Sequence, residues 1–227
     1  MNDGIFRRRR LPHWDVEDGI YFVTACLEGS IPAQGRLDLN RYRDELESGV
    51  KPATIDEPAW ELRKHKLVFA RFDDWIDRIP AVKWLENNQA ARIVRDAMLH
   101  FAGVRYDLLA YVVMPSHFHW VFHPRADWFE EHQKVGDQRT PRECVMQSIK
   151  GFTARECNKL IGLTGTFWQE ESWDHVVRGD DELERIIRYI EDNPVKAGLA
   201  KTPEDYLWSS ARDRKTRSIE PGEYLIR

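Results

Sequence analysis

The sequence predicts an α+β protein in which helices pack on a β-sheet. Segments rich in β-branched and aromatic residues, which favour the extended state, occur at 19–27, 106–123 and 167–178. Segments with the apolar spacing of helices lie between and after them. At 227 residues, of which 42% are hydrophobic, the chain is long enough for one ample core.

The composition argues against several classes of protein. No run of eighteen apolar residues occurs, and the N-terminal segment lacks the apolar core of a signal peptide. Cys26, Cys144 and Cys157 are odd in number and widely spaced, which fits reduced thiols better than disulfides or a zinc ribbon. A net charge of −4 argues against a general nucleic-acid coat protein but leaves room for a local basic face. We therefore expect a cytoplasmic protein that does not bind membranes.

The two ends differ from the middle of the chain. Residues 1–18 are expected to form a basic arm, residues 19–212 a single domain and residues 213–227 a tail. Such basic arms are usually solvated and disordered, but this one could equally bind DNA phosphates, with an aromatic ring stacked on a base. The residues concerned are Arg7, Arg8, Arg9, Arg10 and Trp14.

The first half of the domain is expected to contain one strand and three helices. The strand is 19–27, and the poorly patterned stretch after it holds one short helix at 40–47. Helical spacing follows at 58–78 and is stopped by Pro80. The third helix is capped by Asn87 or Asn88 and runs to about residue 101, before Gly103.

The second half of the domain is expected to begin with two strands and a helix. Residues 106–114 and 118–123 form two strands broken at Pro115, since a proline cannot donate to a sheet ladder. A helix opens at Thr140 and carries Lys150 and Arg155 outward, where their cations are further candidates for binding phosphates.

The last strand is expected at 167–178, followed by a helix at 182–192. Asp180 or Asp181 caps this helix, and Pro194 ends it because the residue before a proline is pushed out of the helical region.

Two histidines carry the first candidate site. His117 and His119 project from the same face of a strand because side chains alternate along it. Two imidazoles on one rigid face make half of a metal site. The alternative for so short a pattern is a solvated histidine pair.

Tyr189 and Asn193 form a second pair. At 100° per residue they share one flank of the apolar face of the last helix, at its junction with the sheet. The structural alternative is a tyrosine at the core margin and an asparagine that caps the helix before proline. Asp174 and His175 are a third candidate, either as sheet-edge hydrogen-bonding groups or as residues that orient the metal site or assist Tyr189 as a base.

Four segments occur in an order that resembles the REP-associated tyrosine transposases, relatives of the single-tyrosine HUH transposases of small insertion sequences. They are MPSHFHW, GFTARECN, WQEESWDHVVR and YIEDNPVKAGL. The N-terminal LPHW and YFVT and the C-terminal YLWSS add to the resemblance, which spans roughly residues 11–210. Ser116 departs from the pattern, since the family more often has asparagine before the first histidine.

The resemblance implies a ferredoxin-like antiparallel sheet of four to five strands, packed with helices. It implies that His117 and His119 bind a divalent metal, Mg²⁺ or Mn²⁺, with Asn193 as third ligand. Tyr189 would then be the nucleophile of a transposase that cuts and rejoins single-stranded DNA at hairpins through a 5′-phosphotyrosine. Such a protein would work near the bacterial nucleoid as a monomer or homodimer, with Tyr189 serving its own histidines or those of a partner.

Other functions stay open. A domesticated protein would bind the same hairpins without cutting them, but the intact set of four candidate residues argues against decay. A zinc hydrolase would need further ligands, and no H-x-H-x-D-H pattern supplies them. A replication-initiator nuclease is chemically close, but no helicase segment is present.

Overall fold

A four-stranded antiparallel sheet forms the centre of the computed structural model, which describes residues 5–8, 12–132, 136–220 and 222–227. The strand order is β4-β5-β3-β6. Its strands are β3 (Tyr21–Cys26), β4 (Tyr106–Val113), β5 (His117–Pro124) and β6 (Trp173–Val176). The predicted α+β fold with an antiparallel sheet is confirmed, and the order is that of a ferredoxin-like sheet.

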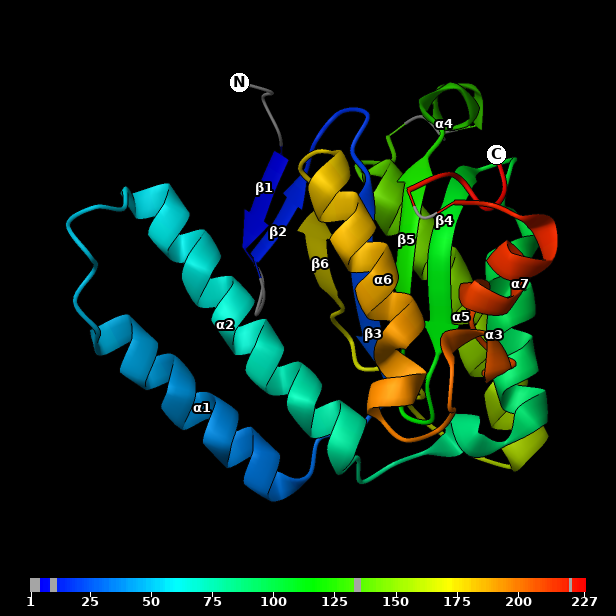
Figure 1. Ribbon diagram of the computed structural model, residues 1–227, viewed down its shortest axis with the longest axis horizontal. Coiled ribbons are helices and arrows are strands. Elements are labelled where there is room, and N and C mark those ends of the chain that lie inside the picture. Colours follow the sequence, from blue (N-terminus) through cyan, green and yellow to red (C-terminus); the bar gives the residue numbers. More distant parts are fainter. Residues whose placement is uncertain (1–4, 9–11, 133–135, 221) are drawn as a thin grey trace.

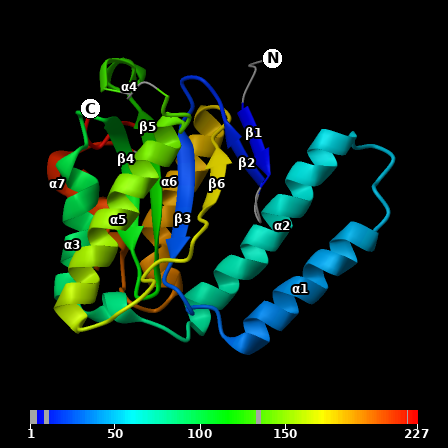
Figure 2. The ribbon, with the colours of Figure 1, turned by 180° about the vertical axis from the view of Figure 1, so that it is seen from behind.

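Helices cover both faces of this sheet (Figures 1 and 2). Helices α3 (Asn88–His100) and α5 (Pro141–Ile161) pack on one face, and α6 (Asp180–Lys196) packs on the other. The smaller elements are η1 (Trp84–Glu86), α4 (Ala126–His132), η2 (Pro203–Asp205) and α7 (Ser210–Arg217). Over the described ranges, no helix combines the length and the apolar character needed to cross a membrane.

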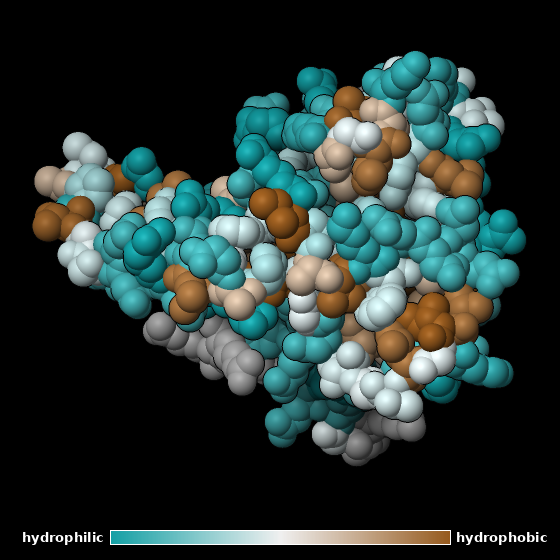
Figure 3. Space-filling model, turned by 90° about the horizontal axis from the view of Figure 1, so that it is seen from below, coloured by the Kyte–Doolittle hydropathy of each residue, from teal (hydrophilic) through white to brown (hydrophobic). Residues whose placement is uncertain are grey.

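A long helical hairpin projects from one side of the body. It consists of α1 (Ala33–Ser48) and α2 (Glu57–Arg78), and it forms the protrusion on the left of Figures 1 and 3. Helix α2 begins where the sequence predicts, because Asp56 accepts a hydrogen bond from the amide of Ala59 and Pro58 lies in the first turn. Its C-terminal end reaches the sheet (Figure 1).

Alternation along β5 divides its side chains between two environments. Phe118, Trp120 and Phe122 are fully buried in the core between the sheet and α3 and α5. His117 and His119 point to the opposite face, together with Val121, which packs against α6. The strand therefore carries its polar pair on a rigid and completely buried support.

Helix α6 is longer than expected, because Pro194 lies inside it and not after its end. The helix continues to Lys196, and the amide of Ala197 still donates to Asn193 at 2.9 Å. Pro194 is buried, so its ring contributes packing that offsets the lost backbone hydrogen bond. The prediction that Pro194 ends the helix was wrong, and Asn193 is an interior helical residue.

Three further boundaries differ from the expectation. Gly179, with φ 85°, is the N-cap of α6, so neither Asp180 nor Asp181 caps it; both lie in the first helical turn. Strand β6 covers only Trp173–Val176 of the expected 167–178, since the preceding residues form a loop bound to α5. The expected short helix at 40–47 is the C-terminal half of the longer α1.

The C-terminal residues contact the body of the domain. The amides of Leu225 and Ile226 donate to the carbonyl of Leu108 in β4 at 2.7 and 3.1 Å. Leu225 is buried. Residues 213–227, expected to be a tail, thus include the second half of α7 and a segment paired with the sheet.

A buried ion pair connects β2 (Pro12–Asp15), α5 and β6. Nε and Nη2 of Arg142 donate to the two carboxylate oxygens of Asp15 at 2.6 and 2.8 Å, and Nη1 lies 3.4 Å from Asp174. All three side chains are buried. Removing one charge would leave the opposite charge unpaired in the interior.

We therefore expect Arg142→Met to lower the free energy of unfolding by about 3–5 kcal/mol, measured by urea denaturation. The matched control is Arg188→Met, which breaks the exposed pair with Glu184 at 3.2 Å and should cost at most about 1 kcal/mol. Equal losses for the two variants would contradict this assignment.

Candidate active site

The two histidines of β5 point their Nε2 atoms at a common place. These atoms lie 3.1 Å apart, and both side chains are completely buried. Nδ1 of His119 lies 2.7 Å from the hydroxyl of Thr24 on the neighbouring strand. Nδ1 of His117 lies 2.9 Å from the hydroxyl of Ser116.

The hydrogen bonds of Ser116 determine which ring nitrogen of His117 carries the proton. Its hydroxyl donates to the carbonyl of Ile76 at 3.0 Å, so it accepts the hydrogen bond from Nδ1–H of His117. Nε2 of the neutral ring is then left with a lone pair, which is the form that binds a metal. The serine that departs from the family pattern therefore holds the first histidine in a ligand-ready state.

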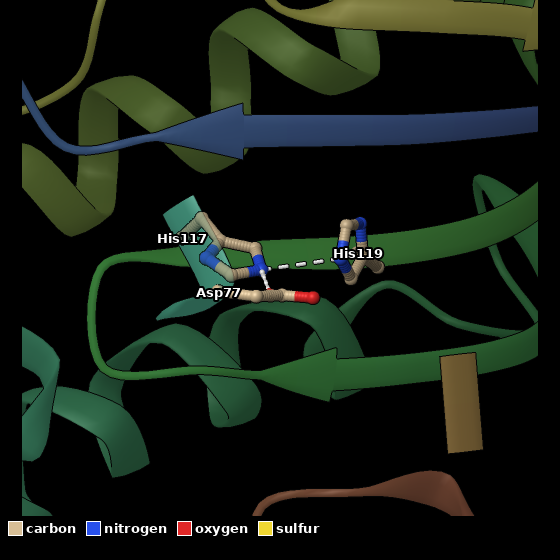
Figure 4. Close-up of side chains that lie close together, drawn as sticks. All are labelled: Asp77, His117 and His119. Atoms are coloured by element: carbon tan, nitrogen blue, oxygen red, sulfur yellow. Dashed lines mark hydrogen bonds and ion pairs between the residues drawn. The ribbon is translucent and has the colours of Figure 1, made fainter. Parts of the chain in front are cut away.

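Helix α2 adds two carboxylates that the sequence analysis missed. Asp77 Oδ1 lies 3.3 Å from Nε2 of His117, and Asp73 Oδ1 lies 3.5 Å from Nε2 of His119. Asp77, His117 and His119 offer ligand atoms within 4.8 Å of one another (Figure 4). The sequence does contain one sign of these ligands, because Asp73 and Asp77 are four residues apart beside the apolar stripe of α2. Acids at this spacing would ordinarily be read as an exposed pair.

Helix α6 brings Tyr189 and Asn193 to the same place. The hydroxyl of Tyr189 donates to Asp73 and lies 3.5 Å from Nε2 of His119. Nδ2 of Asn193 lies 3.2 Å from the same nitrogen and donates to Asp77 at 3.3 Å. One chain thus assembles both predicted pairs, so Tyr189 lies beside the histidines of its own chain.

Burial keeps both imidazoles neutral. It lowers the pKa of His117 to about 3. It also lowers the pKa of His119 well below the ordinary value, and the nearby His117 adds to the effect.

Burial has the opposite effect on the acids. It raises the pKa of Asp73 to about 6, and burial together with the charge of Asp73 raises the pKa of Asp77 to about 8. The pKa of Tyr189 is raised well above its usual value, first by burial and then by the charge of Asp73. All of these shifts oppose negative charge in the cluster, which a cation would relieve.

The donor set fits a divalent cation. Three buried oxygens, Oδ1 of Asp73, of Asp77 and of Asn193, accept no hydrogen bond from the part of the chain that the structure describes. Together with two imidazole nitrogens they form a mixed nitrogen and oxygen set that suits Mn²⁺, Zn²⁺ or Mg²⁺. The side chains of Asp77 and Asp73 are 16% and 11% exposed, so solvent reaches the cluster past these acids.

Asp174 and His175 contact residues outside the histidine cluster. Asp174 lies 3.4 Å from Arg142 in the buried ion pair. His175 lies 3.1 Å from Glu182 on α6. These contacts agree with a structural role at the sheet edge, since β6 is an edge strand.

The candidate DNA-binding residues lie in different surroundings. Lys150 is turned inward and donates to the carbonyls of Gln169 and Glu170 at 2.6 and 2.9 Å, so the expectation that it points outward was wrong. Burial lowers its pKa to about 8. Arg155 is exposed and pairs with Glu156 at 3.3 Å.

The basic arm contains a two-stranded antiparallel sheet of β1 (Ile5–Arg8) and β2. The backbones of Arg7, Arg8 and Trp14 belong to this hairpin, whereas Arg9 and Arg10 lie outside the described residues.

Comparison with known proteins agrees with the fold. The chain is 24% identical over 118 residues to the REP-associated tyrosine transposase of Escherichia coli K12, a match that covers 51% of this chain and 61% of that protein. Over this stretch the chain is similar to the REP-associated tyrosine transposases. A counterpart in Haemophilus influenzae is 23% identical over 125 residues, covering 52% of this chain and 66% of the relative. These matches thus span a little under two thirds of the length of each curated transposase.

A solved structure of a REP-associated tyrosine transposase bound to a REP hairpin has the same fold. It matches with a TM-score of 0.54 and 18% identity over 95% of this chain and 88% of that one. No family model matches the chain.

The cluster leads us to expect that Mn²⁺ or Zn²⁺ stabilises the protein. At a concentration a hundred times the dissociation constant, a bound ion adds about 2.7 kcal/mol. For a chain of this size that corresponds to a rise in Tm of roughly 5–10 °C, measured by scanning calorimetry with and without metal.

The variants His117→Ala and Asp77→Ala should both lose this rise, whereas Asp74→Ala on the same helix should keep it. Asp74 is a suitable control because it is exposed and pairs with Arg78 at 2.7 Å. An unchanged Tm of the unmodified protein with every divalent ion would contradict the metal site.

Proposed function

We propose that this protein is a metal-dependent DNA strand transferase that cuts and rejoins single-stranded DNA at hairpins, with Tyr189 as its nucleophile. The observation that carries the proposal is the position of the Tyr189 hydroxyl, 3.5 Å from Nε2 of His119 at the edge of the group formed by Asp77, His117 and His119. A phenol beside a candidate metal group is what attack on a phosphodiester requires. The hairpin is proposed as substrate because a similar fold is known bound to a REP hairpin.

His117, His119 and Asp77 would hold the ion, with Asn193 as a further oxygen ligand after its amide turns. The ion would supply Lewis-acid stabilisation of charge on the phosphate and would lower the pKa of the phenol. Mg²⁺ and Mn²⁺ are the candidates. Because two carboxylates lie where solvent reaches the site, a DNA phosphate could approach only if positive charge balances them.

Tyr189 would form the bond to phosphorus while the bond to the 3′-oxygen breaks. Asp73 already accepts the hydrogen bond of the phenol and would take its proton, while the leaving 3′-oxygen takes a proton from solvent. Nζ of Lys196 lies 4.9 Å from the centre of the Tyr189 ring, on the exposed end of α6, where it could contact the phosphate. The phosphotyrosine ester keeps the bond energy, so a free 3′-hydroxyl can attack it and rejoin strands.

We expect Tyr189 to become covalently joined to the 5′-phosphate side of a cut strand. Labelled single-stranded hairpin oligonucleotides incubated with the protein and Mn²⁺ or Mg²⁺ should give an adduct that survives denaturing gel electrophoresis. The adduct should vanish with Tyr189→Phe and with His117→Ala. Duplex DNA should be a poor substrate because the site must reach an unpaired backbone.

The control is Tyr224→Phe, which removes another phenol near a histidine: the Tyr224 hydroxyl lies 3.1 Å from Nδ1 of His123. It should leave the adduct unchanged. An adduct that persists with Tyr189→Phe would mean that another residue is the nucleophile. Tight hairpin binding without any adduct would favour the domesticated binding protein.

The arm gives a separate prediction. Replacing Arg7, Arg8, Arg9 and Arg10 by alanine should weaken binding to DNA of any sequence and lower the slope of log affinity against log salt by about 0.7 per lost phosphate contact. Titration at several salt concentrations measures both quantities. An unchanged affinity and slope would identify the arm as a solvated segment.

A further inference from the structure

A cavity of about 1060 Å³ lies on the face of the sheet opposite to Tyr189, between α3, α5 and α4. Figure 2 shows this face with α3 and α5 side by side and α4 above them. Its size is at the upper end of ligand pockets, roughly 300–1,000 Å³. Its walls combine aromatic rings, among them Phe101, Trp128 and Phe152, with the cationic side chains of Arg92 and Arg105.

Arg105 is fixed inside this cavity with most of its hydrogen-bonding capacity unused. Its guanidinium carbon lies 3.5 Å from the ring centre of Phe101 and 4.7 Å from that of Trp128. Nη1 donates to the hydroxyl of Ser148 at 3.3 Å, whereas Nε is buried and has no hydrogen-bond partner among the described residues. A guanidinium has five N–H donors, so several remain for a ligand.

The acids of the cavity do not neutralise this charge. Asp96 pairs with Arg95 at 2.6 Å, and Asp137 accepts a hydrogen bond from Nε of Arg139 at 2.8 Å. Arg92 and Arg105 form no ion pair with any residue in the described ranges. Two cations therefore remain unbalanced at an apolar surface, which favours an anionic ligand.

The same cavity offers flat rings to a partner. The side chain of Phe152 is 45% exposed on α5, although it is a large apolar residue. The ring of Trp128 is already engaged, because it stacks on His132 with ring centres 4.4 Å apart and planes 3° from parallel and Arg105 lies over it at 4.7 Å, so Phe152 is the ring offered to a partner. Aromatic faces beside arginines are the usual surface on which unpaired bases stack while their phosphates are bound.

We propose that the cavity between α3, α5 and α4 binds an unpaired nucleotide of the DNA strand, with Arg105 and Arg92 on its phosphate and Phe152 against its base. This inference rests on the proposed function for the source of the strand. An apolar helix from another protein would use the rings but would leave the guanidinium of Arg105 without an anion, so charge favours the nucleotide.

Helix α6, which carries Tyr189, lies on the opposite face of the sheet from α3 and α5, which line the cavity (Figures 1 and 2), so the proposed contact serves binding and not the cutting step. The hairpin would therefore be held at two places, one at Tyr189 and one behind the sheet.

The first test uses a tetrathymidylate that carries 5-iodouracil, which cross-links to aromatic side chains under ultraviolet light, followed by mass spectrometry of the peptides. We expect cross-links at Phe152. Arg105→Gln and Phe152→Ala should each weaken binding of the unlabelled tetranucleotide roughly tenfold. The matched control Arg212→Gln removes an exposed cation of α7 and should leave the affinity unchanged.

The second test compares a hairpin with unpaired flanking nucleotides and the same hairpin with blunt ends. Arg105→Gln should weaken binding of the first and leave the second unchanged, and it should lower the salt slope by about 0.7. Saturating hairpin DNA should still give the Tyr189 adduct.

The outcomes separate this proposal from the proposed function. Cross-links in the cavity without any hairpin binding or adduct would support the nucleotide site and overturn the hairpin transferase. An adduct at Tyr189 with cross-links only outside the cavity would support the hairpin transferase and overturn the nucleotide site. If Phe152→Ala changes the oligomeric state but not DNA binding, the proposal is overturned, and the exposed ring would instead mediate a contact between copies of this chain.

Folding of the variants is checked by thermal denaturation. Arg105→Gln removes a half-buried charge that forms no ion pair with the described residues, so its Tm should not fall below that of Arg212→Gln by more than a few degrees. If Arg105→Gln is unfolded, Arg92→Gln at the exposed rim gives the same comparison.

Discussion

The alternation of side chains along β5 is the constraint on which the rest of the structure depends. As a central strand, β5 is paired on both edges, so its register with β3 and β4 is fixed by hydrogen bonds on both sides. A shift of one residue would move Phe118 and Trp120 out of the core and bury the other face of the strand in their place. The apolar core behind the sheet therefore fixes where His117 and His119 point.

The two histidines of β5 are covered by α2 as well as by α6. Two neutral imidazoles would pack against an apolar helix at little cost, but α2 places Asp73 and Asp77 against them. Buried carboxylates without strong donors destabilise a fold, as their raised pKa values indicate. A bound cation would need this negative charge, and its binding would restore the stability that the two buried carboxylates cost.

Much of the fold and part of the site could be predicted from the sequence. Strand alternation and helical spacing are local properties, and they placed His117 with His119 and Tyr189 with Asn193. The contribution of Asp77 could not be predicted in this way, because only the tertiary position of α2 brings it to the histidines. Pro194 was misjudged for the same reason: its local preference is outweighed by its burial in α6.

The hydrogen bond between Tyr189 and Asp73 has two opposing effects on the reactivity of the phenol. It holds the phenol oxygen beside His119, as a nucleophile requires, yet the same carboxylate raises the pKa of the phenol and so opposes its ionisation. A positive charge at the imidazole nitrogens reverses the balance, because it stabilises a phenolate more than a phenol. The geometry is thus suited to a tyrosine that stays protonated and inert until a cation and a phosphate arrive together.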